Sequence, residues 1–314
     1  MLISFVIPVL NENESLVQLH SEIVNAIESY NYEIIFIDDG SSDGTLEVMQ
    51  KLVKNDNNVK VISFRRNFGK AAALQVGFKE AKGEIVFTMD ADLQDNPVDI
   101  PKFIAKLDEG YDLVSGWKKK RKDPLNKTAP SKFFNAITAR YFGIKLHDFN
   151  CGFKAYRKDV IKEVDLYGEL HRYIPVLAHA KGYKIAEVEV QHRERQHGKS
   201  KYGFERYMRG FLDLLSVKMV TDFKNSPLYL FGGWGAIFVG LGGGVSLYLT
   251  IMKVFYNMSL SNRPLLFLGV LLILVGMQFF SIGLVCELIV NKTHRITMEN
   301  SISIKDRINT DTEV

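Results

Sequence analysis

The sequence predicts an α/β domain with a mainly parallel sheet, followed by an amphipathic segment and a hairpin of two transmembrane helices. Short β-branched runs alternate with longer helical patterns through the first half of the chain. Polar clusters follow several of these runs directly, and two long apolar stretches occupy the C-terminal third. Alternating strands and helices are typical of βαβ units, in which the parallel strands are buried on both faces.

The first half of the chain is expected to contain four strand–helix pairs. The strands are expected at 3–9, 33–37, 59–64 and 84–89, and the helices at 14–30, 45–54, 71–81 and 100–109. Beyond a basic loop, further strands are expected at 153–156 and 184–190, with helices at 133–141, 160–164 and 173–181. Ligands of such sheets gather at the carboxyl ends of the strands.

Composition disfavours several classes of protein. The net charge of +4 is too small to indicate nucleic-acid binding, so no nucleic-acid partner is expected. Two cysteines, Cys151 and Cys286, cannot form a disulfide framework, which favours a reducing cytosolic setting for the main domain. The histidines are too irregularly spaced to indicate a metal set. No Gly-x-Gly-x-x-Gly follows the first expected strand, which disfavours an NAD-dependent dehydrogenase.

The C-terminal third has the pattern of a membrane anchor. Leu228–Ile251 and Leu265–Val290 each exceed the roughly 20 apolar residues needed to span a bilayer. Residues 204–223 are amphipathic and are expected to lie on the membrane surface, although a packing helix of the soluble domain is the alternative. Basic residues before the first span and after the second place both termini in the cytosol by the positive-inside rule.

These patterns predict an integral membrane protein with four parts. The expected parts are a cytosolic α/β domain at 1–203, interfacial helices at 204–226, two spans within 227–291 and a cytosolic tail at 292–314. The first span is rich in glycine, which permits close helix–helix approach and leads us to expect a homo-oligomer.

A short segment that contains acidic residues follows each of three expected strands. The segments are Asn11-Glu12, Asp38-Asp39 and Asp90-Ala91-Asp92. An Asp-Asp-Gly is often only a loop turn, but three clusters in the same position relative to a strand favour a site. Two carboxylates two residues apart can both reach one hard cation, and Mg²⁺ shares its coordination with substrate phosphates.

The sequence resembles a family 2 glycosyltransferase of the GT-A fold. Within that family it is most similar to the polyprenyl-phosphate branch, which includes dolichol-phosphate mannose synthase and bactoprenol glucosyltransferase. The matching motifs cover about the first 205 residues in the family's order. They are Pro8 to Glu12, Ile37 to Thr45, Arg66 to Lys70, Asp90 to Gln94, Asp148 to Lys154, and Arg195 with Gly198, Ser200, Lys201 and Tyr202.

The resemblance implies a role for each matching position. A nucleotide sugar would be bound by Pro8, Leu10, Glu12, Ile37, Asp39, Lys70, Asp90 and Ala91, with Arg195, Ser200 and Lys201 closing on its phosphates. Mg²⁺ or Mn²⁺ would be bound by Asp90, Asp92 and Gln94, and Asp92 would be catalytic. A cation with arginine and lysine side chains suits the negative charge that develops on a diphosphate leaving group.

The expected acceptor is a polyprenyl phosphate, whose second pKa of about 6 leaves it largely anionic at neutral pH without a general base. Lys118, Arg121 and Lys132 are expected to bind this phosphate. The alternative for the lysine run is a solvated surface attracted to anionic lipid. Asp148 is expected to be a catalytic or acceptor-orienting carboxylate, with a turn or capping role as its alternative.

The resulting hypothesis is inverting transfer of one sugar from a nucleotide sugar to a polyprenyl phosphate at the cytosolic membrane face. UDP-glucose or UDP-N-acetylglucosamine is the favoured donor, with GDP-mannose as an alternative. A processive polysaccharide synthase is disfavoured because its Gln-x-x-Arg-Trp motif is missing and two spans cannot easily enclose a polymer. A non-catalytic nucleotide-sugar-binding membrane protein is the remaining rival.

Overall fold

The computed structural model describes residues 1–119, 135, 138–193, 217, 227–257, 259 and 264–297. The chain divides into two compact units, Met1–Val217 and Lys218–Val314.

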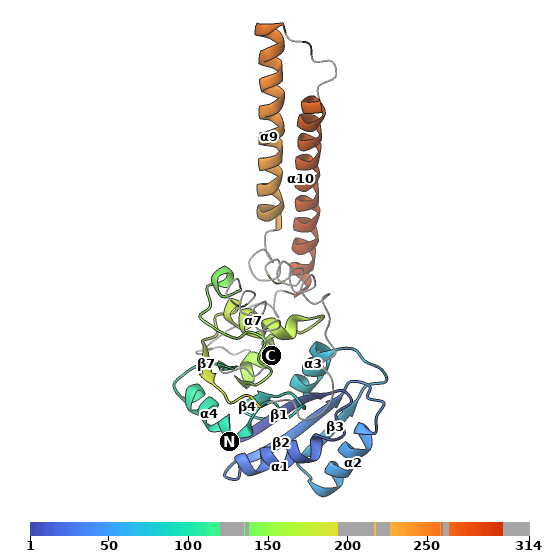
Figure 1. Ribbon diagram of the computed structural model, residues 1–314, viewed down its shortest axis with the longest axis vertical. Helices are drawn as coiled ribbons and strands as arrows, with labels where there is room; N and C mark the ends of the chain where they lie inside the picture. The colour runs from blue at the N-terminus through green and yellow to red at the C-terminus, as the bar shows by residue number, and fades with distance from the viewer. Residues whose placement is uncertain are drawn as a thin grey trace. The chain divides into compact units, whose positions relative to one another are not determined.

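Within the described residues of the first unit, seven strands form one sheet in the order β3-β2-β1-β4-β6-β5-β7 (Figure 1). Strands β1 to β4 pair in parallel, β6 runs antiparallel between β4 and β5, and β7 is parallel to β5. The expected mainly parallel sheet is confirmed. The strands are β1 Leu2–Val9, β2 Asn31–Asp38, β3 Val59–Ser63, β4 Ile85–Thr88, β5 Leu113–Trp117, β6 Lys154–Arg157 and β7 Ile185–Glu189.

Helices connect these strands close to the expected positions. They are α1 Leu16–Ala26, α2 Thr45–Asn55, α3 Lys70–Glu80, α4 Ile100–Asp108, α6 Lys158–Glu163 and α7 Ile174–Ala180, with 3₁₀ turns η1 Pro97–Asp99 and η2 Leu170–Tyr173. Helix α1 is shorter than the expected 14–30, since it begins after the turn at Ser15 and ends near Ile27. Most of the helix expected at 133–141 lies outside the described residues.

The two faces of the sheet bury different helices because successive residues of a strand point to opposite sides. Phe5 on β1 stacks on Phe87 on β4 with ring centroids 5.3 Å apart, and Phe87 meets Phe103 of α4 at 5.8 Å. On the opposite face, α3 approaches the sheet at Gly77, where an added Cβ would lie 2.8 Å from Ile37 Cδ1. Close packing on both faces fixes the strand ends that carry the polar clusters.

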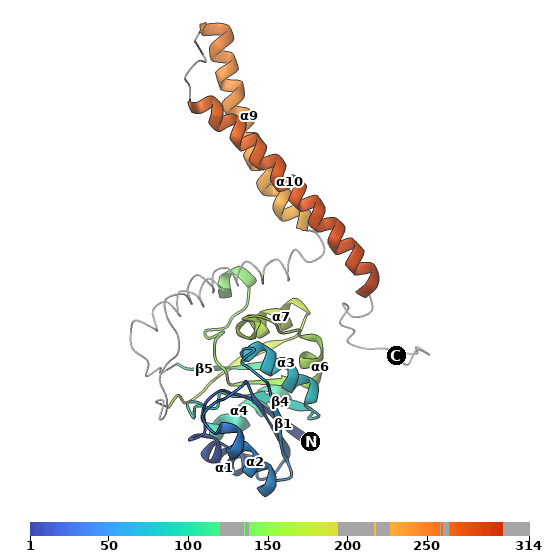
Figure 2. The ribbon, with the colours of Figure 1, turned by 90° about the vertical axis from the view of Figure 1, so that its right-hand side faces the viewer.

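The second unit contains a pair of long apolar helices, α9 Pro227–Tyr256 and α10 Pro264–Thr297. Both are long and apolar enough to cross a membrane. Glycines bring their backbones together, since a Cβ on Gly242 would lie 2.6 Å from the carbonyl oxygen of Gly269, and one on Gly276 would lie 2.7 Å from that of Gly235. Figure 2 shows the two helices crossing. Such contacts through small residues are typical of helix pairs in membranes.

Candidate active site

Three loops meet at the carboxyl ends of β1, β2 and β3. The loops after β1 and β2 are joined by Asn11, whose N–H donates to Ser41 Oγ at 2.9 Å and whose Oδ1 accepts from Ser42 N–H at 2.9 Å. Glu12 N–H donates to Thr45 Oγ1 at 3.0 Å. These bonds make one framework of the Pro8–Glu12 and Asp38–Thr45 motifs, which the sequence places about 30 residues apart.

Asp39 connects this framework to the loop after β3. Its two carboxylate oxygens accept from Phe68 N–H at 2.7 Å and Gly69 N–H at 2.9 Å. The neighbouring Gly40 has φ +77°, and an added Cβ would lie 2.6 Å from the backbone carbon of Arg66. A carboxylate has about four acceptor sites, so Asp39 retains capacity for a further hydrogen bond from a ligand. Of the other residues predicted to bind the nucleotide sugar, Ile37 is fully buried, whereas Pro8 and Leu10 are partly exposed at the end of β1.

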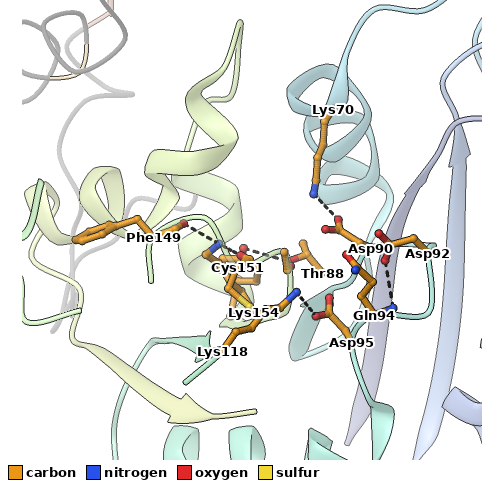
Figure 3. A network of polar contacts seen from close by, with 12 residues as sticks. Lys70, Thr88, Asp90, Asp92, Gln94, Asp95, Lys118, Phe149, Cys151 and Lys154 are labelled. Carbon is orange, nitrogen blue, oxygen red and sulfur yellow. Dashed lines mark hydrogen bonds and ion pairs between the residues drawn. The ribbon is translucent and has the colours of Figure 1, made fainter. Parts of the chain in front are cut away.

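The Asp-x-Asp segment forms a tight turn directly after β4. Figure 3 shows the side chains of Asp90, Asp92 and Gln94 projecting from this turn. Gln94 N–H donates to Asp92 Oδ1 at 3.2 Å. Leu93 has φ +59°, a left-handed conformation that costs of order 1 kcal/mol or more in a residue with a side chain. Because the turn stores this strain, the surrounding structure must hold it in place.

Asp90 is surrounded by ammonium groups. The ammonium of Lys70, at the start of α3, forms an ion pair with Asp90 Oδ1. Withdrawal from water alone would raise the pKa of Asp90, but Lys70 and Lys118 outweigh this effect and hold the pKa at about 2. Asp90 is therefore ionised throughout the neutral range, as a metal ligand must be.

Asp90, Asp92 and Gln94 fit a divalent cation that shares its coordination with a substrate. All three offer oxygen, which Mg²⁺ prefers and which also suits Mn²⁺. Among the described residues no group of three or more His, Cys, Asp or Glu could hold a metal ion by itself. A cation here would complete its shell with water and phosphate oxygens, which is how Mg²⁺ commonly binds in phosphate-using enzymes.

Lys118, predicted to bind the acceptor phosphate, lies in a buried ion pair. Its ammonium is 2.8 Å from Asp95 Oδ1, and the two side chains are 10% and 0% exposed. Burial would lower the pKa of Lys118, but Asp95 and, more weakly, Asp90 raise it above the ordinary lysine value. The pair joins the end of β5 to the loop that carries Asp90 and Asp92 (Figure 3).

A second brace reaches the same loop from residues 191–193. Arg193 N–H donates to the carbonyl of Gln94 at 3.0 Å, and its guanidinium donates to Asn96 Oδ1 at 2.5 Å. The same guanidinium contacts both carboxylate oxygens of Glu22 in α1, at 2.9 and 2.7 Å. Arg193 was not singled out from the sequence, because an arginine outside any motif gives no indication of its partner.

The loop before β6 contacts Asp90 from the other side. Gly152 lies so close that an added Cβ would be 2.5 Å from Asp90 Oδ2. In the same loop Asp148 is 2% exposed, and its Oδ1 accepts from Asn150 N–H at 3.1 Å. The structure thus brings the Asp148–Lys154 motif against the Asp90–Gln94 motif. The predicted catalytic role of Asp148 remains a prediction.

Five predicted site residues lie outside the described part of the chain, and their roles remain predictions. They are Arg121, Lys132, Arg195, Ser200 and Lys201.

Comparison with known proteins identifies the class of this site. The chain belongs to glycosyl transferase family 2, whose model matches residues 4–165. It is 39% identical over 300 residues to a dodecaprenyl-phosphate galacturonate synthase of Rhizobium johnstonii, covering 93% of this chain and 89% of the relative. It is 34% identical over 291 residues to an undecaprenyl-phosphate 4-deoxy-4-formamido-L-arabinose transferase of Shewanella sediminis, covering 91% of this chain and 86% of the relative.

Solved structures support the fold. A glucosyl-3-phosphoglycerate synthase of Mycobacterium tuberculosis, in complex with Mn²⁺, UDP and phosphoglyceric acid, has a TM-score of 0.54 and 18% identity, covering 70% of this chain and 78% of that one. The predicted GT-A architecture is confirmed. The protein is a glycosyltransferase whose curated relatives are polyprenyl-phosphate sugar transferases.

Proposed function

We propose that the protein transfers a single sugar from a nucleotide sugar to a polyprenyl phosphate at the cytosolic face of the inner membrane. The observation that carries this proposal is the position of the Asp90–Gln94 turn. It lies at the carboxyl end of β4, beside the β1 strand that leads to the Pro8–Glu12 loop, in a chain that also contains two helices long enough to cross a bilayer. The names of the relatives support the acceptor class, since each contains a polyprenyl phosphate.

In the proposed reaction, an acceptor phosphate oxygen attacks the anomeric carbon while the bond from that carbon to the donor diphosphate breaks. The configuration inverts, and the product is a sugar–phosphate–lipid with a nucleoside diphosphate as the leaving group. The acceptor is already anionic at neutral pH, so no proton must be removed from it. Asp39 and the loops it connects would orient the nucleoside, while Lys70 would place positive charge beside the diphosphate.

Asp90, Asp92 and Gln94 would hold Mg²⁺ or Mn²⁺ against the diphosphate. When bound, this cation supplies electrostatic stabilisation of the negative charge that develops on the leaving group. Asp148 would orient the acceptor, and Arg195, Ser200 and Lys201 would contact the donor phosphates. Arg121 and Lys132 are proposed to bind the acceptor phosphate, together with Lys118 if its ion pair with Asp95 exchanges for the phosphate.

The relatives extend the set of candidate donor sugars. Their names contain galacturonate and 4-deoxy-4-formamido-L-arabinose rather than glucose or N-acetylglucosamine. We therefore propose a UDP-activated sugar drawn from these four, with GDP-mannose as a further alternative.

The test uses membranes that contain the full-length protein and a panel of labelled donors with Mg²⁺ or Mn²⁺. The panel comprises UDP-glucose, UDP-N-acetylglucosamine, GDP-mannose and the UDP forms of galacturonic acid and 4-deoxy-4-formamido-L-arabinose. We expect one donor to label a chloroform-soluble lipid, and Asp92→Asn to abolish this labelling. Failure of every donor would overturn the proposal, and retained activity in Asp92→Asn would remove the metal role from Asp92.

A further inference from the structure

Lys154 is a buried lysine inside the sheet, directly beside the Asp90 turn. It is the first residue of β6, where it pairs with Thr88 of β4 on one side and with Ser115 of β5 on the other. The residue is only 3% exposed. An ammonium in such a position is costly unless its hydrogens are accepted and its charge serves a purpose.

The ammonium of Lys154 binds backbone carbonyls rather than solvent. It donates to the carbonyl of Phe149 at 3.3 Å and to that of Cys151. Both carbonyls belong to the 148–152 loop, which thus folds back onto the strand that it precedes (Figure 3). Because the donor and acceptors are enclosed by the sheet, removing the ammonium would leave two carbonyls without a partner.

The same loop is held from β4 as well. Thr88 Oγ1 donates to the carbonyl of Gly152 at 2.8 Å. Lys154 and Thr88 therefore hold consecutive carbonyls, at positions 151 and 152, and press Gly152 against the carboxylate of Asp90. At Gly152 an added Cβ would lie 2.5 to 2.7 Å from the atoms of that carboxylate. The 148–152 loop therefore limits where the Asp90 carboxylate can lie.

The charge of Lys154 faces the acidic side of the site. Burial lowers the pKa of Lys154 below its ordinary value and Lys70 lowers it further, whereas the nearby carboxylates of Asp148 and Asp90 only partly offset these effects. Asp148 lies in the same loop as the two carbonyls that Lys154 binds, and Asp90 approaches that loop at Gly152. Lys70 binds the Asp90 carboxylate directly, whereas the ammonium of Lys154 binds the backbone of the 148–152 loop.

We propose that Lys154 is a positioning residue for the metal carboxylate Asp90, acting through the 148–152 loop that its ammonium fixes against that carboxylate. This inference rests on the proposed metal role of Asp90. Its consequence is that Lys154 controls the affinity of the site for a divalent cation without touching the cation. Outer-shell residues that fix a ligand typically change metal affinity by roughly 10- to 100-fold when removed.

The test measures Mn²⁺ binding to the full-length protein in detergent, by the electron paramagnetic resonance signal of free Mn²⁺, with UDP present and separately with GDP. We expect Lys154→Met to weaken Mn²⁺ binding roughly 10- to 100-fold. Lys162→Met, which changes a 62% exposed lysine of the following helix α6, is the matched control and is expected to bind Mn²⁺ like the wild type.

A second variant tests the contact between the 148–152 loop and Asp90 while leaving Lys154 in place. Gly152→Ala places a methyl group where the Asp90 carboxylate lies, and this carboxylate can rotate away without unfolding the sheet. We expect the same weakening of Mn²⁺ binding at an unchanged melting temperature. If Lys154→Met does not fold, Gly152→Ala alone tests whether the 148–152 loop positions the Asp90 carboxylate.

The outcomes separate this inference from the proposed function. Wild-type Mn²⁺ affinity in folded Lys154→Met, or in Gly152→Ala, would overturn the positioning role while leaving the proposed reaction intact. No Mn²⁺ binding to the wild type with either nucleotide would overturn the metal role of Asp90, and the inference with it.

Discussion

At the scale of single residues, two of the lysines near Asp90 are more deeply buried than lysines usually are. Lys118 begins a run of basic residues, which is typical of a surface, yet it lies in a buried ion pair with Asp95. Lys154 follows a phenylalanine in an expected strand and is buried as well. The sequence contains a sign of this second case, since a lysine in a buried strand requires an internal partner.

The Lys118–Asp95 pair leads to a prediction about stability. Lys118→Met leaves the Asp95 carboxylate buried without its cation, which typically costs about 3–5 kcal/mol. For a unit of this size we expect the melting temperature to fall by roughly 10 °C. Lys118→Met combined with Asp95→Leu is expected to recover most of that loss, since both charges are removed together. Thermal unfolding of the detergent-solubilised protein measures both changes.

The same variant separates a structural role from the predicted acceptor contact. If Lys118 only bound the acceptor phosphate, replacing it with methionine would raise the KM for the lipid and leave the melting temperature unchanged. That result for Lys118→Met would contradict the stabilising role of the ion pair.

At the scale of elements, the sequence predicted β1 to β4 because each is rich in β-branched and aromatic residues and is followed by a helical pattern. β5 was not predicted, because Leu113–Trp117 is short and contains a serine and a glycine. Gly116 is needed there, since a Cβ would lie 2.9 Å from Cys151 Sγ. The turn motifs were predicted because their residues are consecutive, whereas the braces from Lys118 and Arg193 join residues distant in sequence.

The opposite end of the sheet is held by a buried carboxylate in β2. Glu33 accepts from Ser4 Oγ at 2.5 Å and from Lys82 N–H at 2.6 Å, and lies 2.9 Å from the ammonium of Lys60. Burial alone would raise the pKa of Glu33, but the hydrogen bonds from Ser4, Lys60 and Lys82 lower it below the ordinary value. A lowered pKa means that Glu33 stabilises the fold above pH of about 4.3 and that this stability is lost as the pH falls through the lower folded value.

Glu33→Gln is therefore expected to lower the melting temperature at pH 7 and to flatten its decline below pH of about 4.3. The measurement is thermal unfolding across a pH series. Glu80→Gln removes an exposed carboxylate that also contacts Lys60, at 3.2 Å, and serves as the control. An equal effect of both variants would show that the exposed pair, rather than the buried cluster, carries the pH dependence.

At the scale of the whole molecule, the chain joins a glycosyltransferase domain to a pair of long apolar helices, which suits the proposed reaction, whose acceptor is a lipid phosphate. The glycines of α9 divide into two sets. Gly232, Gly235 and Gly242 face α10, whereas an added Cβ on Gly233, Gly240, Gly243 or Gly244 would meet nothing within 4 Å beyond its own stretch of helix in the described part of the chain. The glycine-rich composition that led us to expect a homo-oligomer is thus partly explained by packing within one chain.

This division predicts which glycines the hairpin depends on. Gly276→Leu places a bulky side chain against the carbonyl of Gly235 and the side chain of Val239, so α9 and α10 must separate. We expect a clear fall in the thermal stability of the hairpin, followed by aggregation of the detergent-solubilised protein on heating. Gly243→Leu adds the same side chain where there is open space and is expected to leave the aggregation temperature unchanged. Equal damage from Gly243→Leu would contradict the assignment and would place a second copy of the chain on that face, which crosslinking in membranes would then detect.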